Sequence, residues 1–177
     1  MEDKTSGNVV SEDCINTHII NELSLPLITI GINNAVVVAT PDGILVADKK
    51  KSAKIKKLVK NSRPMYEKRN WGEYKVLDYK VQSNGTNSLT KELIIKPGEH
   101  ISYQIHKQRT EMWTFISGEG ELIINDILSK VRVGDTAVIK PGVKHAVKAI
   151  NELHIIEVQI GDELTEDDIE RLEYNWG

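Results

Sequence analysis

Short apolar runs separated by turn residues dominate the chain from residue 64 onward. The runs are four to eight residues long, with Gly, Pro, Asn and Asp between them. Runs of this length and spacing are typical of β-sandwiches and β-barrels rather than of βαβ units. We predict strands within 74–79, 88–95, 101–105, 112–116, 121–124, 136–139, 146–150 and 153–159. The pattern therefore predicts an all-β barrel over residues 64–177.

The preceding part of the chain, residues 1–63, has a different pattern. Ala35–Thr40 and Ile44–Ala47 are apolar runs that flank Pro41-Asp42-Gly43, which favours a strand, a tight turn and a second strand. This part is too small to bury a good core by itself. We therefore expect it to pack on the barrel or on a second chain. Because closed dimers are the commonest assembly, we predict a homodimer.

A lysine-rich helix is predicted after this hairpin. Asp48 is placed to cap its N-terminus, and the helix would run to Lys60 with Ile55, Leu58 and Val59 on one face. The lysines on the other faces could bind an anion, but a solvated helix surface is the more ordinary arrangement.

A second, short helix is predicted near the C-terminus. Thr165-Glu-Asp-Asp168 has the capping-box spacing, with acidic side chains in the first turn. Ile169 and Leu172 would then pack inward.

Composition limits the cellular location and the classes of binding partner that we expect. The net charge of −3 argues against nucleic acid or an anionic membrane surface as the main partner. Cys14 is the only cysteine, so no disulfide can form within the chain, which favours a reducing, cytoplasmic location. The first residues contain no apolar core of a signal peptide, and no apolar run approaches the length of a membrane helix. We expect a soluble cytoplasmic protein.

Four side chains have the spacing of a metal site in a small β-barrel. Gln104 and His106 are two residues apart, so on a strand both point to the same face. Glu111 follows on the returning strand, and His145 comes from a distant hairpin. One amide oxygen, two imidazoles and one carboxylate form a mixed set that suits zinc, iron, manganese or cobalt. The sequence therefore predicts a divalent-metal site.

The same stretch resembles the first cupin motif. It runs from Gly98 to Gly118 with the spacing Gly-x5-Gln-x-His-x4-Glu-x6-Gly, and residues 134–145 resemble the second motif. Gln104 stands where most cupins have His. In this respect the chain is similar to the phosphomannose isomerases, whose zinc is held by Gln, His, Glu and His. The resemblance implies a cupin barrel and places zinc ahead of the other metals.

A longer resemblance covers residues 67–173. It is carried by Asn70–Leu77, Lys96–Trp113 and Ile156–Arg171, which follow the C-terminal half of the bifunctional mannose-1-phosphate guanylyltransferase/mannose-6-phosphate isomerase family. The part before it resembles that family's connecting segment, which carries part of a left-handed β-helix. The Gly-rich nucleotide loop of the family's nucleotidyltransferase head has no counterpart in the sequence. The resemblance thus implies isomerase activity without guanylyltransferase activity from this chain alone.

The resemblance also implies a reaction, the interconversion of mannose 6-phosphate and fructose 6-phosphate in the supply of nucleotide-sugar or polysaccharide precursors. It assigns Arg109 and Arg171 to the substrate. The alternatives without a substrate role are a surface salt bridge for Arg109 and, for Arg171, an i,i+4 ion pair with Asp167 on a helix. The expected partner is therefore a small phosphorylated sugar.

Three lysines are weaker candidates for contact with the substrate phosphate: Lys107, Lys140 and Lys144. Lysines in turns are usually solvated, and Lys107 and Ala149 both depart from the family pattern, which has His and Asn there. Two other functions stay open. One is a non-catalytic sugar-phosphate-binding or oligomerisation module that partners a separate guanylyltransferase. The other is a different cupin chemistry, such as epimerisation or dioxygenation.

Overall fold

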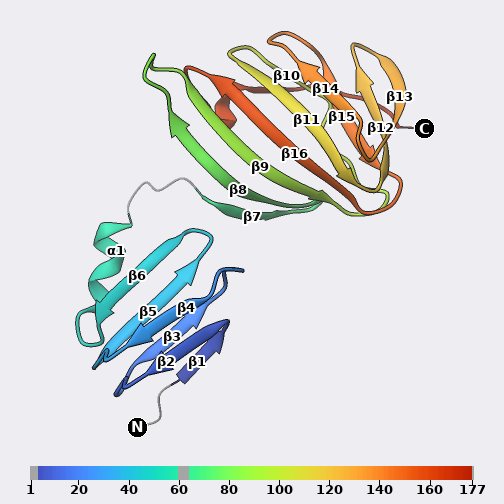
Figure 1. The fold of residues 1–177 in the computed structure, drawn as a ribbon. Coiled ribbons are helices and arrows are strands. Elements are labelled where there is room, and N and C mark those ends of the chain that lie inside the picture. The colour runs from blue at the N-terminus through green and yellow to red at the C-terminus, as the bar shows by residue number, and fades with distance from the viewer. Residues whose placement is uncertain (1–3, 60–63, 177) are drawn as a thin grey trace. The chain divides into compact units, whose positions relative to one another are not determined.

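The chain has two compact units, Met1–Met65 and Tyr66–Gly177, in a computed structural model that describes residues 4–59 and 64–176 (Figure 1). Each unit has its own sheets and its own buried residues. The predicted boundary after residue 63 falls outside the described residues. Within the described ranges, no helix is both long and apolar enough to cross a membrane.

Short stacked strands form the first unit. The strands described are β1 (Lys4–Gly7), β2 (Val9–Glu12), β3 (His18–Asn21), β4 (Leu27–Ile30), β5 (Ala35–Thr40) and β6 (Gly43–Asp48). β1, β3 and β5 pair in parallel, as do β2 and β4, while β5 and β6 form the predicted antiparallel hairpin. Parallel pairing of strands this close in sequence is the arrangement of successive β-helix coils. Buried Asn21 holds a corner, because its Nδ2 donates to the carbonyl oxygens of Asn8 and Leu25 at 2.8 and 2.7 Å.

The predicted lysine-rich helix is much shorter than expected. It consists of a 3-10 turn at Ser52–Lys54 and one α-helical turn, α1 (Ile55–Leu58). Asp48 does not cap it: Asp48 ends β6, and its Oδ1 accepts the Lys50 N–H at 2.9 Å. No acidic side chain lies in the first turn and no side chain caps it, so little favours helix growth against the cost of nucleation. The predicted end at Lys60 lies outside the described residues.

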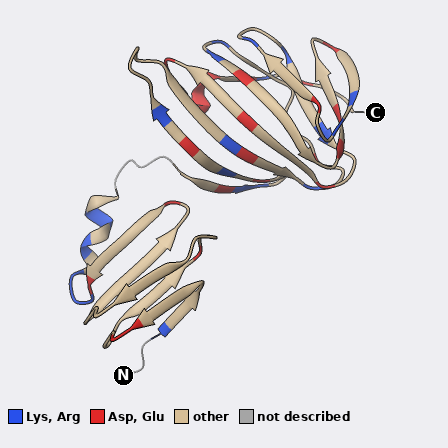
Figure 2. Cartoon of the chain, in the orientation of Figure 1, with Lys and Arg blue, Asp and Glu red and all other residues tan. Residues whose placement is uncertain are grey.

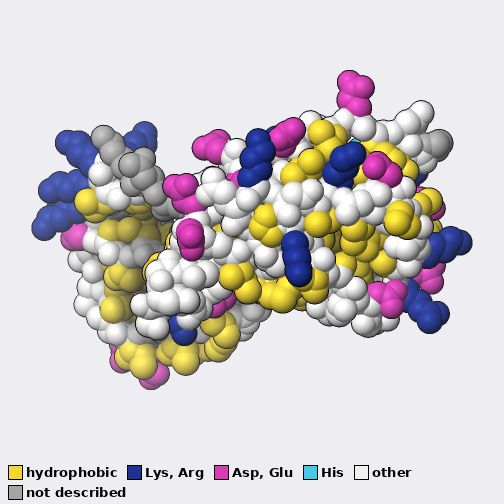
Figure 3. All heavy atoms as spheres, turned by 90° about the horizontal axis from the view of Figure 1, so that it is seen from above, with side chains coloured by type: hydrophobic (Ala, Val, Ile, Leu, Met, Phe, Trp, Pro, Cys, Tyr) yellow, Lys and Arg dark blue, Asp and Glu magenta, His cyan; other side chains and the backbone are white. Residues whose placement is uncertain are grey.

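The apolar face predicted for this helix is not buried within its unit. Leu58 and Val59 are 81% and 55% exposed. Figure 3 shows Lys and Arg side chains gathered on the surface at the end of the unit where α1 lies. The lysines therefore form a solvated surface, which is the more ordinary of the two arrangements weighed above.

Two antiparallel sheets form the second unit (Figure 1). The larger has the strand order β14-β11-β16-β9-β8-β7 and the smaller β13-β12-β15-β10-β17. The strands are β7 (Tyr66–Arg69), β8 (Gly72–Val81), β9 (Asn87–Ile95), β10 (Gln104–His106), β11 (Arg109–Ser117), β12 (Glu119–Ile124), β13 (Ile127–Arg132), β14 (Thr136–Ile139), β15 (His145–Ala149), β16 (Leu153–Gly161) and β17 (Ile169–Arg171). The predicted all-β cupin fold is confirmed.

Burial alternates along the long strands of the larger sheet. Leu89, Leu93 and Ile95 on β9 are buried, and so is Ile155 on the neighbouring β16. Figure 2 shows that charged residues also occur in the middle of this sheet and not only in its loops. Lys91 on β9 and Glu157 on β16 are buried, so some charged side chains occupy inward positions of the barrel.

The predicted C-terminal helix is wrong. Glu166–Asp168 form a 3-10 turn, and the chain continues as β17, which pairs antiparallel with β10. Thr165 is extended, with φ −119° and ψ 158°, and its side chain caps no N–H group. Without β17 this side of β10 would leave backbone groups unpaired, so sheet pairing outweighs the local capping signal. Leu172 nevertheless packs against a buried cluster, as predicted.

Candidate metal centre

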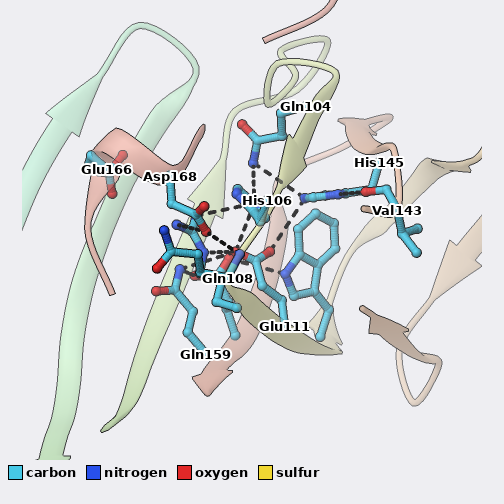
Figure 4. Close-up of polar contacts among 12 residues, drawn as sticks. Gln104, His106, Gln108, Glu111, Val143, His145, Gln159, Glu166 and Asp168 are labelled. Carbon is cyan, nitrogen blue, oxygen red and sulfur yellow. Dashed lines mark hydrogen bonds and ion pairs between the residues drawn. The ribbon is translucent and has the colours of Figure 1, made fainter. Parts of the chain in front are cut away.

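Three neighbouring strands bring the four predicted metal ligands together (Figure 4). β10 carries Gln104 and His106, which share a face because strand side chains alternate. β11 carries Glu111, and β15 begins with His145, which lies opposite Gln104 in the antiparallel register. β10 and β15 pair in the smaller sheet, whereas β11 belongs to the larger one, so the ligands come from both sheets and not from a β10–β11 hairpin.

The ligand atoms form a compact, buried group. His106 Nε2 lies 3.1 Å from Glu111 Oε1, and His145 Nε2 lies 3.5 Å from Glu111 Oε2. One ligand atom from each of these three residues lies within 4.8 Å of the others. The three side chains are at most 1% exposed. A group this tight can surround a single ion.

An outer hydrogen bond orients His145, whereas Nδ1 of His106 is buried and has no hydrogen-bond partner. His145 Nδ1 is 3.0 Å from the Val143 carbonyl oxygen, so Nδ1 donates there and Nε2 keeps its lone pair. His106 Nε2 is 3.2 Å from Arg109 Nη2, and since a guanidinium can only donate, this nitrogen also carries a lone pair. Glu111 Oε2 is buried and receives no hydrogen bond. A cation would satisfy all three atoms, so the donor set fits a divalent metal.

Gln104 completes the set in a different orientation. Its Nε2 faces the centre, 3.3 Å from His106 Nε2 and 3.5 Å from His145 Nε2, while its Oε1 accepts the Ser102 hydroxyl at 2.9 Å. A half-turn of the amide would bring Oε1 to the ion. The Ser102 hydroxyl could then accept from Nε2, because a hydroxyl both donates and accepts.

Glu111 is ionised despite its burial. Burial opposes the charged form most strongly, but the adjacent imidazoles of His106 and His145 and the charge of Arg109 together hold the pKa of Glu111 well below its usual value. Arg109 Nε donates to Glu111 Oε1 at 2.8 Å, and the Arg109 side chain is 3% exposed. Arg109 therefore faces the ligand set and does not form a surface salt bridge.

A cavity of about 530 Å³ opens beside the ligand set. Gln104 and Glu111 reach its wall from the metal side. The wall also holds the cations Lys68, Arg69, Lys91, Arg109 and Arg171 and the acids Glu67, Glu157 and Glu166. Its volume is in the range of small-molecule sites, and its cations suit an anionic ligand.

Two of these residues, Glu157 and Lys91, were missed by the sequence analysis. Glu157 Oε2 accepts the Trp113 Nε1–H at 3.2 Å, and Oε1 accepts Gln159 Nε2–H at 2.6 Å. Burial, and then the charge of Glu111, raise the pKa of Glu157 to about 7. Both residues sit at inward positions of strands whose neighbouring inward positions are apolar or amide. A charged residue at an inward position of an otherwise apolar strand face is the sequence signal by which both residues could have been identified.

The other predicted substrate residues separate into two groups. Arg171 lies on β17 opposite Gln104 and lines the cavity, so it is not part of a helical pair with Asp167. The three lysines do not line the cavity. Lys107 pairs with Glu170 at 3.0 Å, and Lys144 pairs with an exposed aspartate. Lys140 is exposed as well. Their placement gives a phosphate role no support.

Comparison with known families matches both units. Residues 54–174 match the family described as mannose-6-phosphate isomerase C-terminal, and residues 7–61 match the mannose-phosphate isomerase/GMP-like β-helix domain. The second match agrees with the parallel coils of the first unit.

Curated relatives are longer proteins. The chain is 33% identical over 182 residues to the mannose-1-phosphate guanylyltransferase RfbM of Salmonella typhimurium, covering 97% of this chain and 37% of that protein. It is 32% identical over 184 residues to the xanthan biosynthesis protein XanB of Xanthomonas campestris, covering 97% and 38%. The chain thus spans a little over a third of the length of these relatives.

Among solved structures, the capsular polysaccharide assembling protein CapF of Staphylococcus aureus has a TM-score of 0.52 at 14% identity, over 67% of this chain and 34% of that chain. This likeness concerns the fold alone. The match over residues 54–174 covers more than half of the sequence. The chain therefore belongs to the mannose-6-phosphate isomerase C-terminal family.

Proposed function

We propose that this chain is a metal-dependent isomerase that interconverts mannose 6-phosphate and fructose 6-phosphate, with zinc as its metal. Family membership supports the substrate class. The observation that carries the proposal is one cavity that joins a buried metal-ligand set, a carboxyl group with a pKa of about 7, and several cations.

The reaction moves a proton between two neighbouring carbons through an enediol. A bound divalent metal supplies positive charge that polarises the substrate oxygens. Glu157 is the residue suited to take the proton from one carbon and return it to the other, because an acid–base group works best with a pKa near the working pH. Trp113 and Gln159 each hold one of its oxygens, which fixes the carboxyl plane.

Cations on the cavity wall would bind the phosphate group of the substrate. Arg171 lines the cavity and can offer two parallel N–H groups to phosphate oxygens. Lys91 is nearly buried, with its Nζ 3.4 Å from Glu166 Oε1 and 4.6 Å from the Tyr74 ring centroid. Arg109 lies beside the ligand set, and its three nitrogens have partners there or at Thr165. We assign Arg171 to the phosphate and Arg109 to the metal side.

A coupled assay tests the proposal. The protein is stripped of metal, reloaded with zinc, cobalt, manganese or iron, and given mannose 6-phosphate, and fructose 6-phosphate is detected. We expect turnover only in a metal-loaded form, and loss of both metal and turnover in His106→Ala. His154→Ala is the matched control, because His154 pairs with Glu92 and Glu152 outside the cavity. Metal binding without turnover in any form would refute the isomerase.

The second candidate is a non-catalytic sugar-phosphate-binding or oligomerisation module for a separate guanylyltransferase. It is favoured by the relatives, several of which are named mannose-1-phosphate guanylyltransferases. This role predicts sugar-phosphate binding without turnover. The homodimer stays a prediction that sedimentation equilibrium tests. Apolar side chains that such an assembly could cover are Ile28, Ile30, Ile44 and Val46, each more than 60% exposed.

A further inference from the structure

Asp168 connects the C-terminal segment to the strands that carry the metal ligands (Figure 4). Its side chain is only 5% exposed. It contacts the end of β10 although the two lie some sixty residues apart in the sequence. Asp168 Oδ1 accepts the Lys107 N–H at 3.0 Å, and Oδ2 accepts the Gln108 N–H at 3.3 Å. A buried carboxylate that receives two backbone N–H groups is a strong, directional contact.

These two N–H groups belong to the whole connection between β10 and β11. β10 ends at His106 and β11 begins at Arg109, so Lys107 and Gln108 alone form the turn. The turn sets how His106 on one strand faces Glu111 on the other. Asp168 therefore acts on the ligand geometry from outside the ligand set, as partners beyond the ligands do in metal sites.

Asp168 also lies beside the Arg109 guanidinium. Arg109 Nη1 donates to the Thr165 carbonyl oxygen at 2.9 Å and is 3.7 Å from Asp168 Oδ2. The same guanidinium donates to Glu111 Oε1 and to His106 Nε2, and the lone pair of His106 Nε2 is one that a metal needs. Asp168 Oδ2 is an acceptor toward which this guanidinium can move, because a shift of under 1 Å brings 3.7 Å into hydrogen-bond range.

We propose that Asp168 is a positioning residue of the metal centre. It fixes the β10–β11 turn, and it takes the Arg109 guanidinium when His106 and Glu111 bind the ion. The inference rests on the metal-binding part of the proposed function and is independent of the sugar. Its negative charge also offsets the positive charge of Arg109, which would otherwise oppose a cation at the centre.

The test compares Asp168→Asn with Asp167→Asn, the exposed neighbour in the same 3-10 turn. Affinity for Co²⁺ and Zn²⁺ is measured by competition with a chromophoric chelator, and the visible spectrum of the saturated cobalt form reports ligand geometry. We expect Asp168→Asn to weaken both affinities about 10- to 100-fold and to shift the cobalt spectrum. Asp167→Asn should match the wild type in both measurements.

The outcomes separate this inference from the metal site itself. If the wild type binds neither ion, the metal site fails. If the wild type binds both ions and Asp168→Asn is indistinguishable from it, the metal site stands and the role of Asp168 is refuted. Should Asp168→Asn not fold, the Arg109 Nε–H resonance of the wild type decides, because zinc should move it. A resonance that stays in place on zinc binding would overturn the proposed movement of Arg109.

Discussion

Replacing Glu157 by Gln removes the charge of the buried acid and keeps its shape. The pKa of Glu157 is about 7 in the folded chain, against an ordinary value of 4.5, because of burial and the nearby Glu111 charge. The unfolded chain therefore loses this proton at lower pH than the folded chain. Folded-state stability must then fall as the pH rises from about 4.5 to about 7. At about 1.4 kcal/mol per pKa unit, the whole effect is about 3 kcal/mol.

The Gln side chain has no proton to lose, so this loss of stability should be absent. One hydrogen bond is lost in exchange, because the amide keeps a single acceptor oxygen for Trp113 and Gln159, at a cost of about 1 kcal/mol. We expect the metal-free variant to be about 2 kcal/mol more stable than the wild type at pH 8. At pH 4.5 it should be no more stable than the wild type.

Urea unfolding of chelator-treated protein between pH 4.5 and 8.5 measures the difference. Glu99→Gln is the control, because Glu99 is exposed and should leave the pH dependence unchanged. In the isomerase assay, Glu157→Gln should lower turnover at least 100-fold, the usual share of a general acid–base group. Parallel stability curves for the wild type and Glu157→Gln would refute a raised pKa. Unchanged turnover would remove Glu157 from the reaction.

Three further predictions follow from the same structure. Arg171→Gln should raise KM for the phosphorylated sugar about 10- to 100-fold with a smaller change in kcat, whereas Lys107→Gln should leave both steady-state constants unchanged. Ile155→Ala should lower the free energy of unfolding by about 2–5 kcal/mol, against less than about 0.5 kcal/mol for the 73% exposed Ile127, as urea titration will measure. Chelation of metal held at about 100 times its Kd should lower the Tm of the second unit by about 10 °C in calorimetry.

The metal-ligand set could be predicted from the sequence because its signal is local and periodic. Gln104 and His106 share a face through the two-residue period of a strand, and the turn that follows returns the chain to Glu111. The structure brings His145 to the same place through the pairing of β15 with β10. Resemblance to a known motif added His145, which spacing alone could not place.

The rest of the site depends on contacts between distant parts of the chain. Lys91 and Glu157 are partners in register across β9 and β16, a relation that only strand pairing defines. The C-terminal segment carries a good helix-capping signal at Thr165, yet it forms a strand because β10 offers it an edge. Local signals fail at such positions because the free energy of tertiary pairing exceeds that of capping.

The pairing of β17 with β10 has a consequence for folding, because it affects the stage at which the metal centre can bind an ion. The segment that holds β10 and β11 carries three ligands close together in sequence, but the fourth is 41 residues beyond Gln104, and the Asp168 carboxylate is 61 residues beyond Lys107. Closing loops of this length costs entropy and slows folding. We therefore expect tight binding of the ion only late in folding, after the barrel has closed.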